Sequence, residues 1–487
     1  MEPLGTITVY FPFIDEEAKD ILETTMQAAH DYYDFVNSLI DLVLETECSD
    51  LIVYFAVHHA IQLLDVKSIN KIGRKYSHLP IIMPNLFFTT AFQGYSEDLD
   101  NVRKAADEVL ATQPDGWLVL EMRFMKFESE TWQYPNVQHD SSNLETILKM
   151  IKKEPNFGFY EAIYYSNLAA CAHIDGDSKE RIQCNEKAIE ITRKFDDKIR
   201  LAYNLREKAN IVESQDRRLA KELLFEAGNL MNFLGSKEGY SQVYESVSYL
   251  EAIRGEFNSA IEHYLEVVSI RESLGLETGW ISLMLSTLYN IIAEFESGLE
   301  WGRMAEEQYM HAPKQQPRAV LNQVWSLIAL RKISEATAIL NTIRESIVKS
   351  GQETLLAWLN FITGLLELED GDLTSAISSI EEALKIYEAR EDLLMQILFL
   401  HNLAKIEVYK SNVTSEVFPY LTLLEERAIS EDLPGILGQT LLLKSEIALL
   451  QNDDPRLREI IQQLRPLSQE PKMAFILPSF EKLLNRI

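Results

Sequence analysis

Residues 360–386 read NFITGLLELEDGDLTSAISSIEEALKI. Apolar side chains recur at helical spacing on both sides of the acidic turn, which predicts two helices joined by a tight connection. Gly371 is the residue type that best tolerates a left-handed conformation at a helix end, and Asp372 can cap the helix that follows. Ala376 and Ala383 lie two turns apart on that second helix, where small side chains let neighbouring helices pack closely. The stretch therefore predicts an antiparallel helix pair.

The same pattern recurs about every 40 residues along the chain. Similar stretches cover residues 165–191, 244–270 and 282–308. Self-similarity at this period predicts a stacked array of about eight helix pairs, because each pair can bury its apolar face only against its neighbours. The residue near the start of each second helix, usually small, follows the series Arg181, Ala220, Ala260, Gly298, Ala336, Ala376, Glu416 and Leu457.

Residues 157–470 resemble tetratricopeptide (TPR) repeats. The period is longer than usual and the closing Pro is mostly missing, which is similar to the repeats of peptide-sensing bacterial regulators, signalling ATPase sensor arms and kinesin light chains. The resemblance implies an all-α fold, a right-handed superhelical solenoid of antiparallel helix pairs, with a concave groove that binds a protein or a peptide. It rests on the Gly-Asp turns and on Leu168, Ala169, Ala188, Ala260, Ala376 and Ala383.

The sequence pattern divides the chain into three parts. Residues 1–156 are helical by periodicity but less regular, so they are either degenerate repeats that continue the solenoid or a separate helical domain. Residues 157–470 hold the repeat array. Residues 471–487 are expected to form a C-terminal helix that caps the last repeat or, alternatively, serves as a self-association surface.

Composition limits the partners and the compartment. The 487 residues include 75 Asp and Glu against 46 Lys and Arg, a net charge of −29, so nucleic acid and anionic membranes are poor partners. Three Cys without a CxxC spacing provide neither a disulfide framework nor a zinc site, which favours a reducing compartment. The first residues, Met1 to Gly5, show neither the basic n-region nor the apolar h-region expected of a signal peptide, and the longest apolar stretch, residues 51–64, is too short to span a bilayer. These features predict a cytoplasmic protein.

The sequence contains no familiar catalytic or cofactor motif. It has no Walker A loop, no GxGxxG, no GxSxG and no HExxH. His58 and His59 are adjacent on a predicted helix and point about 100° apart, so they do not readily face one metal ion. We therefore expect no cofactor, no metal ion and no catalytic residue. A further hypothesis places an enzyme site in residues 1–156, around the two histidines and the polar loop at 130–142.

Asparagine recurs at one place in four predicted first helices. Asn is a mediocre helix former, so its recurrence needs a reason, and its amide offers both donors and an acceptor to a peptide backbone. The resemblance implies the same role, because an Asn at a similar place holds a peptide's backbone or carboxylate in peptide-binding TPR proteins. Alternatively, these side chains bond to the neighbouring helix backbone or to water, or are simply exposed. The four are Asn167, Asn204, Asn322 and Asn402.

The same register predicts further groove residues. Two arginines would start first helices on the inner side, and aromatic residues at first-helix positions are either core packing or anchors for a partner. An acidic groove prefers a basic or apolar ligand. The residues are Arg200, Arg318, Tyr203, Tyr249, Trp280, Trp325 and Trp358.

Together these patterns predict a non-catalytic scaffold or adaptor that binds a protein or peptide in a concave groove. The alternative is a regulatory protein, in which a peptide or small ligand in the groove changes how the N-terminal region meets a partner protein. The groove hypothesis requires that the four asparagines face the groove rather than the core.

Overall fold

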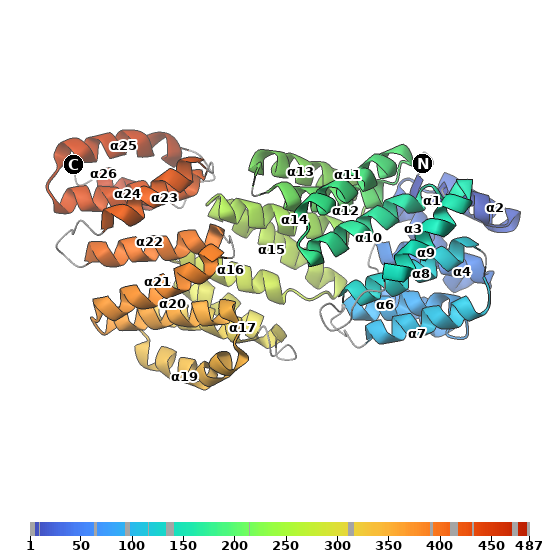
Figure 1. The fold of residues 1–487 in the computed structure, drawn as a ribbon, viewed down its shortest axis with the longest axis horizontal. Coiled ribbons are helices and arrows are strands. Elements are labelled where there is room, and N and C mark those ends of the chain that lie inside the picture. Colours follow the sequence, from blue (N-terminus) through green and yellow to red (C-terminus); the bar gives the residue numbers. More distant parts are fainter. Residues whose placement is uncertain are drawn as a thin grey trace. The chain divides into compact units, whose positions relative to one another are not determined.

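The computed structural model describes residues 5–8, 10–62, 66–92, 98–114, 116–132, 141–213, 215–309, 316–389, 393–409, 417–430, 433–469 and 476–484. Every regular element in these ranges is a helix (Figure 1). The all-α prediction is therefore confirmed, whereas the right-handed superhelix stays a prediction. None of the described helices is long and apolar enough to cross a lipid bilayer. Glu416 and residues 133–140 of the expected polar loop lie outside the described residues.

From residue 160 to residue 468, the described residues form eight helix pairs, as the repeat pattern predicts. The first helices are α10 (Tyr160–Asp175), α12 (Lys198–Val212), α14 (Lys237–Ile253), α16 (Gly279–Ile291), α18 (Gln316–Ala329), α20 (Glu353–Glu369), α22 (Leu393–Tyr409) and α24 (Pro434–Leu450). The second helices are α11 (Ser178–Lys194), α13 (Arg217–Phe233), α15 (Phe257–Leu274), α17 (Phe295–Gln308), α19 (Ile333–Ser350), α21 (Leu373–Ala389), α23 (Val417–Ser430) and α25 (Asp454–Ser468).

The small residue of the repeat is the fourth residue of the second helix. It is buried as Ala220, Ala336 and Ala376, and a glycine occupies the place in α17. At that glycine, Gly298, a Cβ atom would lie 2.5 Å from Oδ1 of Asn290, so a methyl group does not fit. The close approach of the paired helices therefore depends on small side chains, as expected.

The turns between paired helices have the predicted conformation. Gly176 and Gly371 have φ values of +76° and +82°, in the left-handed region that favours glycine. The next residue in each turn, Asp177 or Asp372, accepts a hydrogen bond at its carboxylate from a backbone N–H three residues on. The start of the second helix is thus capped by the side chain that precedes it.

The chain forms two compact units. The N-terminal unit comprises Met1–Ser246 and Ser269–Glu277, and the C-terminal unit comprises Val247–Val268 and Thr278–Ile487. The division passes through α14 and α15. The three-part division expected from the sequence stays a prediction, although its boundary after residue 156 lies inside the N-terminal unit.

The N-terminal unit places further helices in front of the first repeats. One hydrophobic core begins at Ile7, runs through these helices to α10 and includes Ile199 of α12 and Leu234. At Gly235, with φ +67°, a Cβ atom would lie 2.6 Å from Cβ of Tyr33, so α3 meets the connection after α13. The helices are α1 (Gly5–Thr8), α2 (Glu16–Ala28), α3 (Tyr32–Glu45), α4 (Asp50–Gln62), α5 (Val66–Lys75), α6 (Met83–Phe92), α7 (Asp98–Ala111), α8 (Gly116–Trp132) and α9 (Ser141–Lys153), with the short 3-10 helices η1 (Phe11–Phe13), η2 (Pro80–Ile82) and η3 (Pro155–Phe157).

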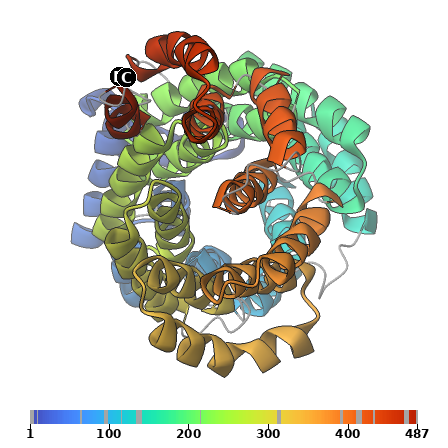
Figure 2. The same cartoon turned by 90° about the vertical axis from the view of Figure 1, so that its left-hand side faces the viewer.

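The C-terminal unit follows a curved path, seen in Figure 2 from the yellow helices to the red ones. First helices of successive pairs pack on one another, as α16 does on α18 and α18 on α20. The backbone N–H of Gly435, at the start of α24, donates to the carbonyl oxygen of Arg254 at 3.3 Å. The last helix, α26 (Leu477–Leu484), packs Phe480 and Leu483 into the core formed by α24 and α25.

Candidate functional site

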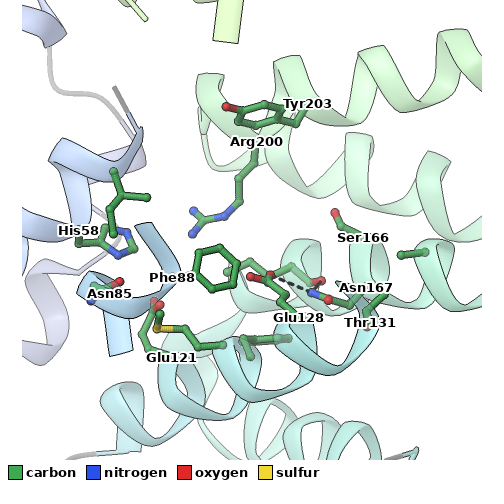
Figure 3. A pocket seen from close by; sticks show the side chains of 15 residues that line it. His58, Asn85, Phe88, Glu121, Glu128, Thr131, Ser166, Asn167, Arg200 and Tyr203 are labelled. Carbon is green, nitrogen blue, oxygen red and sulfur yellow. Dashed lines mark hydrogen bonds between the residues drawn. The ribbon is translucent and has the colours of Figure 1, made fainter. Parts of the chain in front are cut away.

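A cavity of about 410 Å³ lies inside the N-terminal unit. Its walls come from α4, α6, α8, α10 and α12 (Figure 3), so the added helices and the first two repeats enclose it together. Polar side chains in the lining are His58, Asn85, Glu121, Glu128, Thr131, Ser166, Asn167, Arg200 and Tyr203, and apolar ones include Ile61, Phe88, Phe124, Met125, Ile163 and Ala170.

The three helices α8, α10 and α12 each present one face to this cavity. On α10 the lining residues are Ile163, Ser166, Asn167 and Ala170, which follow the i, i+3, i+4, i+7 spacing of a single helix face. A second cavity of about 410 Å³ is lined by the same face of α10 and also by Arg200 and Tyr203. It continues along α10 and α12 to His173, Asn204 and Glu207. We call the two adjoining cavities the groove.

Glu121 of α8 lines the first cavity but not the second. Its Oε1 accepts hydrogen bonds from the hydroxyl groups of Tyr10, at 3.0 Å, and Tyr160, at 2.9 Å. Burial raises the pKa of this carboxyl group, while Arg200 and the two hydroxyl groups oppose the shift. The sequence patterns did not single out Glu121, although it is the one acid in the mainly apolar stretch 117–127.

Glu128, two turns further along α8, lines both cavities. Burial raises the pKa of its carboxyl group to about 7. Its Oε1 accepts a long hydrogen bond of 3.4 Å from Nδ2 of Asn167 (Figure 3). No ion pair of Glu128 occurs among the described residues. The hydrogen bond from Asn167 and the positive charge of Arg200 oppose this pKa shift only in part.

The two adjacent histidines have different surroundings. His58 lines the groove, and its Nε2 lies 3.4 Å from the hydroxyl group of Tyr10. Burial lowers the pKa of His58 to about 3, so its imidazole is neutral at pH 7. His59 is fully buried, outside the lining, with Nδ1 3.0 Å from the hydroxyl group of Tyr32. Within the described ranges, no group of three or more His, Cys, Asp or Glu side chains could hold a metal ion.

Arg200 brings a positive charge to the groove. Its Nη1 donates to Oδ2 of Asp197 at 2.6 Å, and the backbone N–H of Arg200 donates to Oδ1 of the same aspartate, which caps α12. The guanidinium group extends toward the space between His58 and Phe88 (Figure 3). The cap therefore fixes both the start of α12 and the direction of the arginine side chain.

Two of the predicted asparagines line the groove, and both are largely buried. Asn167 is 7% exposed and donates from Nδ2 to the carbonyl oxygen of Ile163 at 2.9 Å. Asn204 is 5% exposed and accepts at Oδ1 from the hydroxyl group of Ser166 at 2.8 Å. Their amides thus already have partners on α10. Whether they also contact a ligand stays a prediction.

The other two asparagines belong to the C-terminal unit. The expectation that Asn322 faces a groove is wrong, because its side chain is fully buried and donates to the carbonyl oxygen of Leu283 and the hydroxyl group of Thr287. For Asn322, the alternative explanation of the asparagine pattern applies, in which the side chain bonds to a neighbouring helix. Asn402 is partly buried and donates to the carbonyl oxygen of Leu398, and it lines a cavity of about 130 Å³.

The predicted arginine and aromatic residues are divided between core and surface. Trp325 is 6% exposed and Trp358 is fully buried, so both pack inside the C-terminal unit. Arg318 lies over the ring of Trp358, with its guanidinium carbon 3.9 Å from the ring centroid. Trp280 is 46% exposed and Tyr249 is partly exposed. Tyr203 lines the groove, with its hydroxyl group 3.5 Å from the carboxylate of Glu238.

The groove brings titratable groups together, which the enzyme hypothesis requires, but it extends beyond residues 1–156 to α10 and α12. The hydroxyl group of Ser166 contacts the carbonyl oxygen of Ala162 and Oδ1 of Asn204 rather than a histidine. Cys171 and Cys184 line neither cavity. The enzyme site in the N-terminal region therefore stays a prediction.

The sequence matches no protein-family model and no curated protein sequence. Among solved structures, the chain is similar to aspartyl phosphate phosphatase F from Bacillus subtilis, at 15% identity and a TM-score of 0.48 over 71% of this chain and 93% of that one. It is similar to the Rap protein complexed with competence and sporulation factor, at 13% identity and a TM-score of 0.45 over 69% of this chain and 99% of that one.

A third similar structure is a signal transduction ATPase with numerous domains from Pyrococcus horikoshii, described as having a tetratricopeptide repeat sensor. The identity is 16% and the TM-score is 0.45, over 79% of this chain. The chain spans 55% of the length of that protein. The helical-repeat architecture of the present chain rests on its own eight helix pairs.

Proposed function

We propose that the protein is a non-catalytic binding scaffold that holds an extended peptide, free or part of a larger protein, in the groove of the N-terminal unit. The observation that carries the proposal is the continuity of the two cavities along one face of α8, α10 and α12. A groove that crosses successive helices offers a repeating set of contacts to a chain that runs along it.

The lining suits a peptide because it mixes hydrogen-bonding groups with apolar side chains. A peptide backbone needs both donors and acceptors, which Ser166, Asn167 and Tyr203 can supply. Ile163 and Ala170 provide apolar surface between these polar groups. The combination is that of a binding site with a few oriented polar groups in a mainly apolar wall.

A display library of random peptides, applied to the immobilised full-length protein, tests the proposal. We expect the protein to enrich a family of related peptides. Ala170→Trp places an indole in both cavities and should abolish the enrichment, whereas Asn210→Trp, on an exposed position of α12, should preserve it. Enrichment of the same peptides by the Ala170→Trp variant, or no enrichment by the unmodified protein, would contradict the proposal.

A second candidate is a ligand-responsive regulator, and the position of Tyr10 favours it. Tyr10 precedes η1, is 1% exposed, and contacts both Glu121 and His58 at the groove wall. A ligand that displaced either contact would loosen the N-terminal segment and so change a surface that a partner protein could read. The check is amide hydrogen exchange over residues 10–28 with and without an enriched peptide. Unchanged hydrogen exchange over these residues would contradict the regulator and favour the scaffold.

A further inference from the structure

The charges around the groove do not balance. Arg200 supplies the positive charge, but its guanidinium group is paired with Asp197 at 2.6 Å. His58 contributes no charge at pH 7, because burial lowers its pKa to about 3. Glu121 and Glu128 remain as acidic groups in the lining. The first cavity therefore has two carboxyl groups against one arginine, whose positive charge acts on both of them and is shared with Asp197.

The two acids differ in how far the protein satisfies them. Glu121 is 6% exposed and accepts from two tyrosine hydroxyl groups. Glu128 has the single contact of 3.4 Å with Asn167, and it lies where the two cavities meet. Thus the less satisfied carboxyl group is the one that a ligand can reach from either cavity.

Other acceptors surround Glu128. The hydroxyl group of Thr131 donates to the carbonyl oxygen of Phe127 at 3.0 Å, which leaves its oxygen free to accept. Asn167 donates from Nδ2 to Glu128 and to the carbonyl oxygen of Ile163, which leaves Oδ1 as an acceptor. An ammonium group has three donors and no acceptor, so it matches a carboxylate flanked by a hydroxyl and an amide oxygen.

The remaining wall suits an apolar body attached to such a cation. Phe88, Phe124, Met125 and Ile163 line the same cavity. Apolar surface of this kind favours the methylene or side-chain carbons of a ligand, and an aromatic ring can also attract an ammonium group.

We propose that Glu128, Thr131 and Asn167 form a subsite for the ammonium group of a ligand with an apolar body. The ammonium group is that of a lysine side chain or of a peptide N-terminus, two sources of the same chemistry. The inference rests on the proposed function, because it names the chemical group that the groove recognises.

Binding at this subsite is coupled to protonation. Burial raises the pKa of Glu128 to about 7, so a proton and a ligand cation compete for the same carboxyl group near neutral pH. The charged and titratable groups that face it are Arg200 and Tyr203 from α12, Glu121 from α8 and His58 from α4, with His173, Glu207 and the ion-paired Arg181 toward the second cavity. Ligand affinity should therefore fall by about tenfold per pH unit once the pH is below the pKa of Glu128.

Calorimetric titration of the full-length protein with three six-carbon probes tests the inference. We expect n-hexylammonium to bind more tightly than hexan-1-ol and hexanoate at pH 8, and to lose about tenfold in affinity per unit below pH 7. Glu128→Gln should remove both the preference for the cation and its pH dependence. Glu145→Gln, in an exposed pair with Lys149, is the matched control and should change neither. The probe series and pH profile of the unmodified protein also test the inference without any variant.

Equal or tighter binding of hexanol or hexanoate, or no binding of hexylammonium, would overturn the inference. So would an unchanged pH profile in a folded Glu128→Gln variant. Enriched library peptides with and without N-terminal acetylation, and with lysine replaced by norleucine, distinguish the two sources of the ammonium group. If peptides bind in the groove but neither change weakens them, the ammonium subsite is wrong while the scaffold proposal stands; if no peptide binds, the scaffold proposal itself fails.

Discussion

Arg200 and Asn204 are the third and seventh residues of α12 in the N-terminal unit, and Arg318 and Asn322 are the third and seventh residues of α18 in the C-terminal unit. The same residue types at the same helix positions have different roles. Arg200 extends into the groove, whereas Arg318 is stacked on the ring of Trp358. Asn204 lines the groove, whereas Asn322 is fully buried between first helices.

The difference comes from what lies opposite these helices within each unit. In the N-terminal unit, α4, α6 and α8 leave about 410 Å³ open beside α12. In the C-terminal unit, Phe361 and Trp358 connect Trp325 to Phe399 through ring contacts with centroids 5.0 to 6.2 Å apart, and the cavity beside Trp325 is about 130 Å³. Both units thus have the same helix-pair backbone, and the side chains inside each unit determine whether the space beside the first helices is open or filled.

The largest expected effect is the loss of the aromatic filling. Trp358→Ala removes a fully buried indole from the C-terminal unit and should lower the free energy of unfolding by about 3 to 5 kcal/mol. Trp280→Ala removes the same side chain from a position that is 46% exposed and should cost less than about 1 kcal/mol. Urea unfolding followed by circular dichroism measures both. Equal losses would show that the buried ring does not support this unit.

The second expected effect concerns the two asparagines at the seventh helix position. Asn322→Ala leaves the hydroxyl group of Thr287 and the carbonyl oxygen of Leu283 without their amide partner in a buried core, which should cost about 1 to 3 kcal/mol. Asn204→Ala affects Ser166 beside the groove, where water can replace the lost contact, so we expect less than about 1 kcal/mol. Thermal melts of the two variants under the same conditions give the difference. A larger loss at Asn204 would contradict the contrast between an open and a filled interior.

Much of the fold was predictable because its signals are local. The glycine and aspartate of a turn, and the small residue four places into the next helix, determine a helix pair from within one stretch of about 30 residues. Glycine at positions 176 and 371 has the expected left-handed conformation, and the buried small residue is found at Ala220, Ala336 and Ala376. The eight pairs follow from repetition of that local pattern.

The site was less predictable because it depends on residues far apart in the sequence. Glu121 meets Tyr10 across 111 residues and Tyr160 across 39, and no repeat pattern links these positions. The asparagine pattern was visible, but burial depends on the side chains that face each helix. The sequence therefore identified Asn204 and Asn322 as equivalent, although only the first lines a groove.

The third expected effect is a pH-dependent gain in stability in the open unit. The folded-state pKa of Glu128 is raised to about 7 from its ordinary value of 4.5, so the folded protein binds more protons than the unfolded chain between these values, and stability falls as the pH rises. This rise corresponds to at most about 3 kcal/mol at pH 8, and the partial solvent access of the Glu128 side chain reduces it. Glu128→Gln should therefore stabilise the protein by on the order of 1 to 2 kcal/mol at pH 8, with little change at pH 4.

The measurement is the difference in unfolding free energy between the variant and the unmodified protein at several pH values. Taking a difference cancels the contribution of His58, whose lowered pKa acts in the opposite sense below pH 6.5. Glu145→Gln, at an exposed position, should give a difference that does not change with pH. A Glu128→Gln difference that is equally flat would show that the groove leaves this carboxyl group well solvated.

The smallest expected effect concerns the glycine turns that end first helices in both units. Gly176 and Gly371 end first helices in the N-terminal and C-terminal units, with similar positive φ values and nothing within 4 Å of an added Cβ atom. Substitution of either glycine by alanine therefore introduces backbone strain without a clash, and each should cost about 1 kcal/mol in urea unfolding. Gly255, at φ +75°, provides the contrast, because its Cβ would lie 2.8 Å from the backbone nitrogen of Ile436 and should cost more. Equal losses of unfolding free energy at Gly176 and Gly371 would mean that the turn contributes the same stability whether the interior of its unit is open or filled. Clearly unequal losses would mean that the interior side chains also influence the turns.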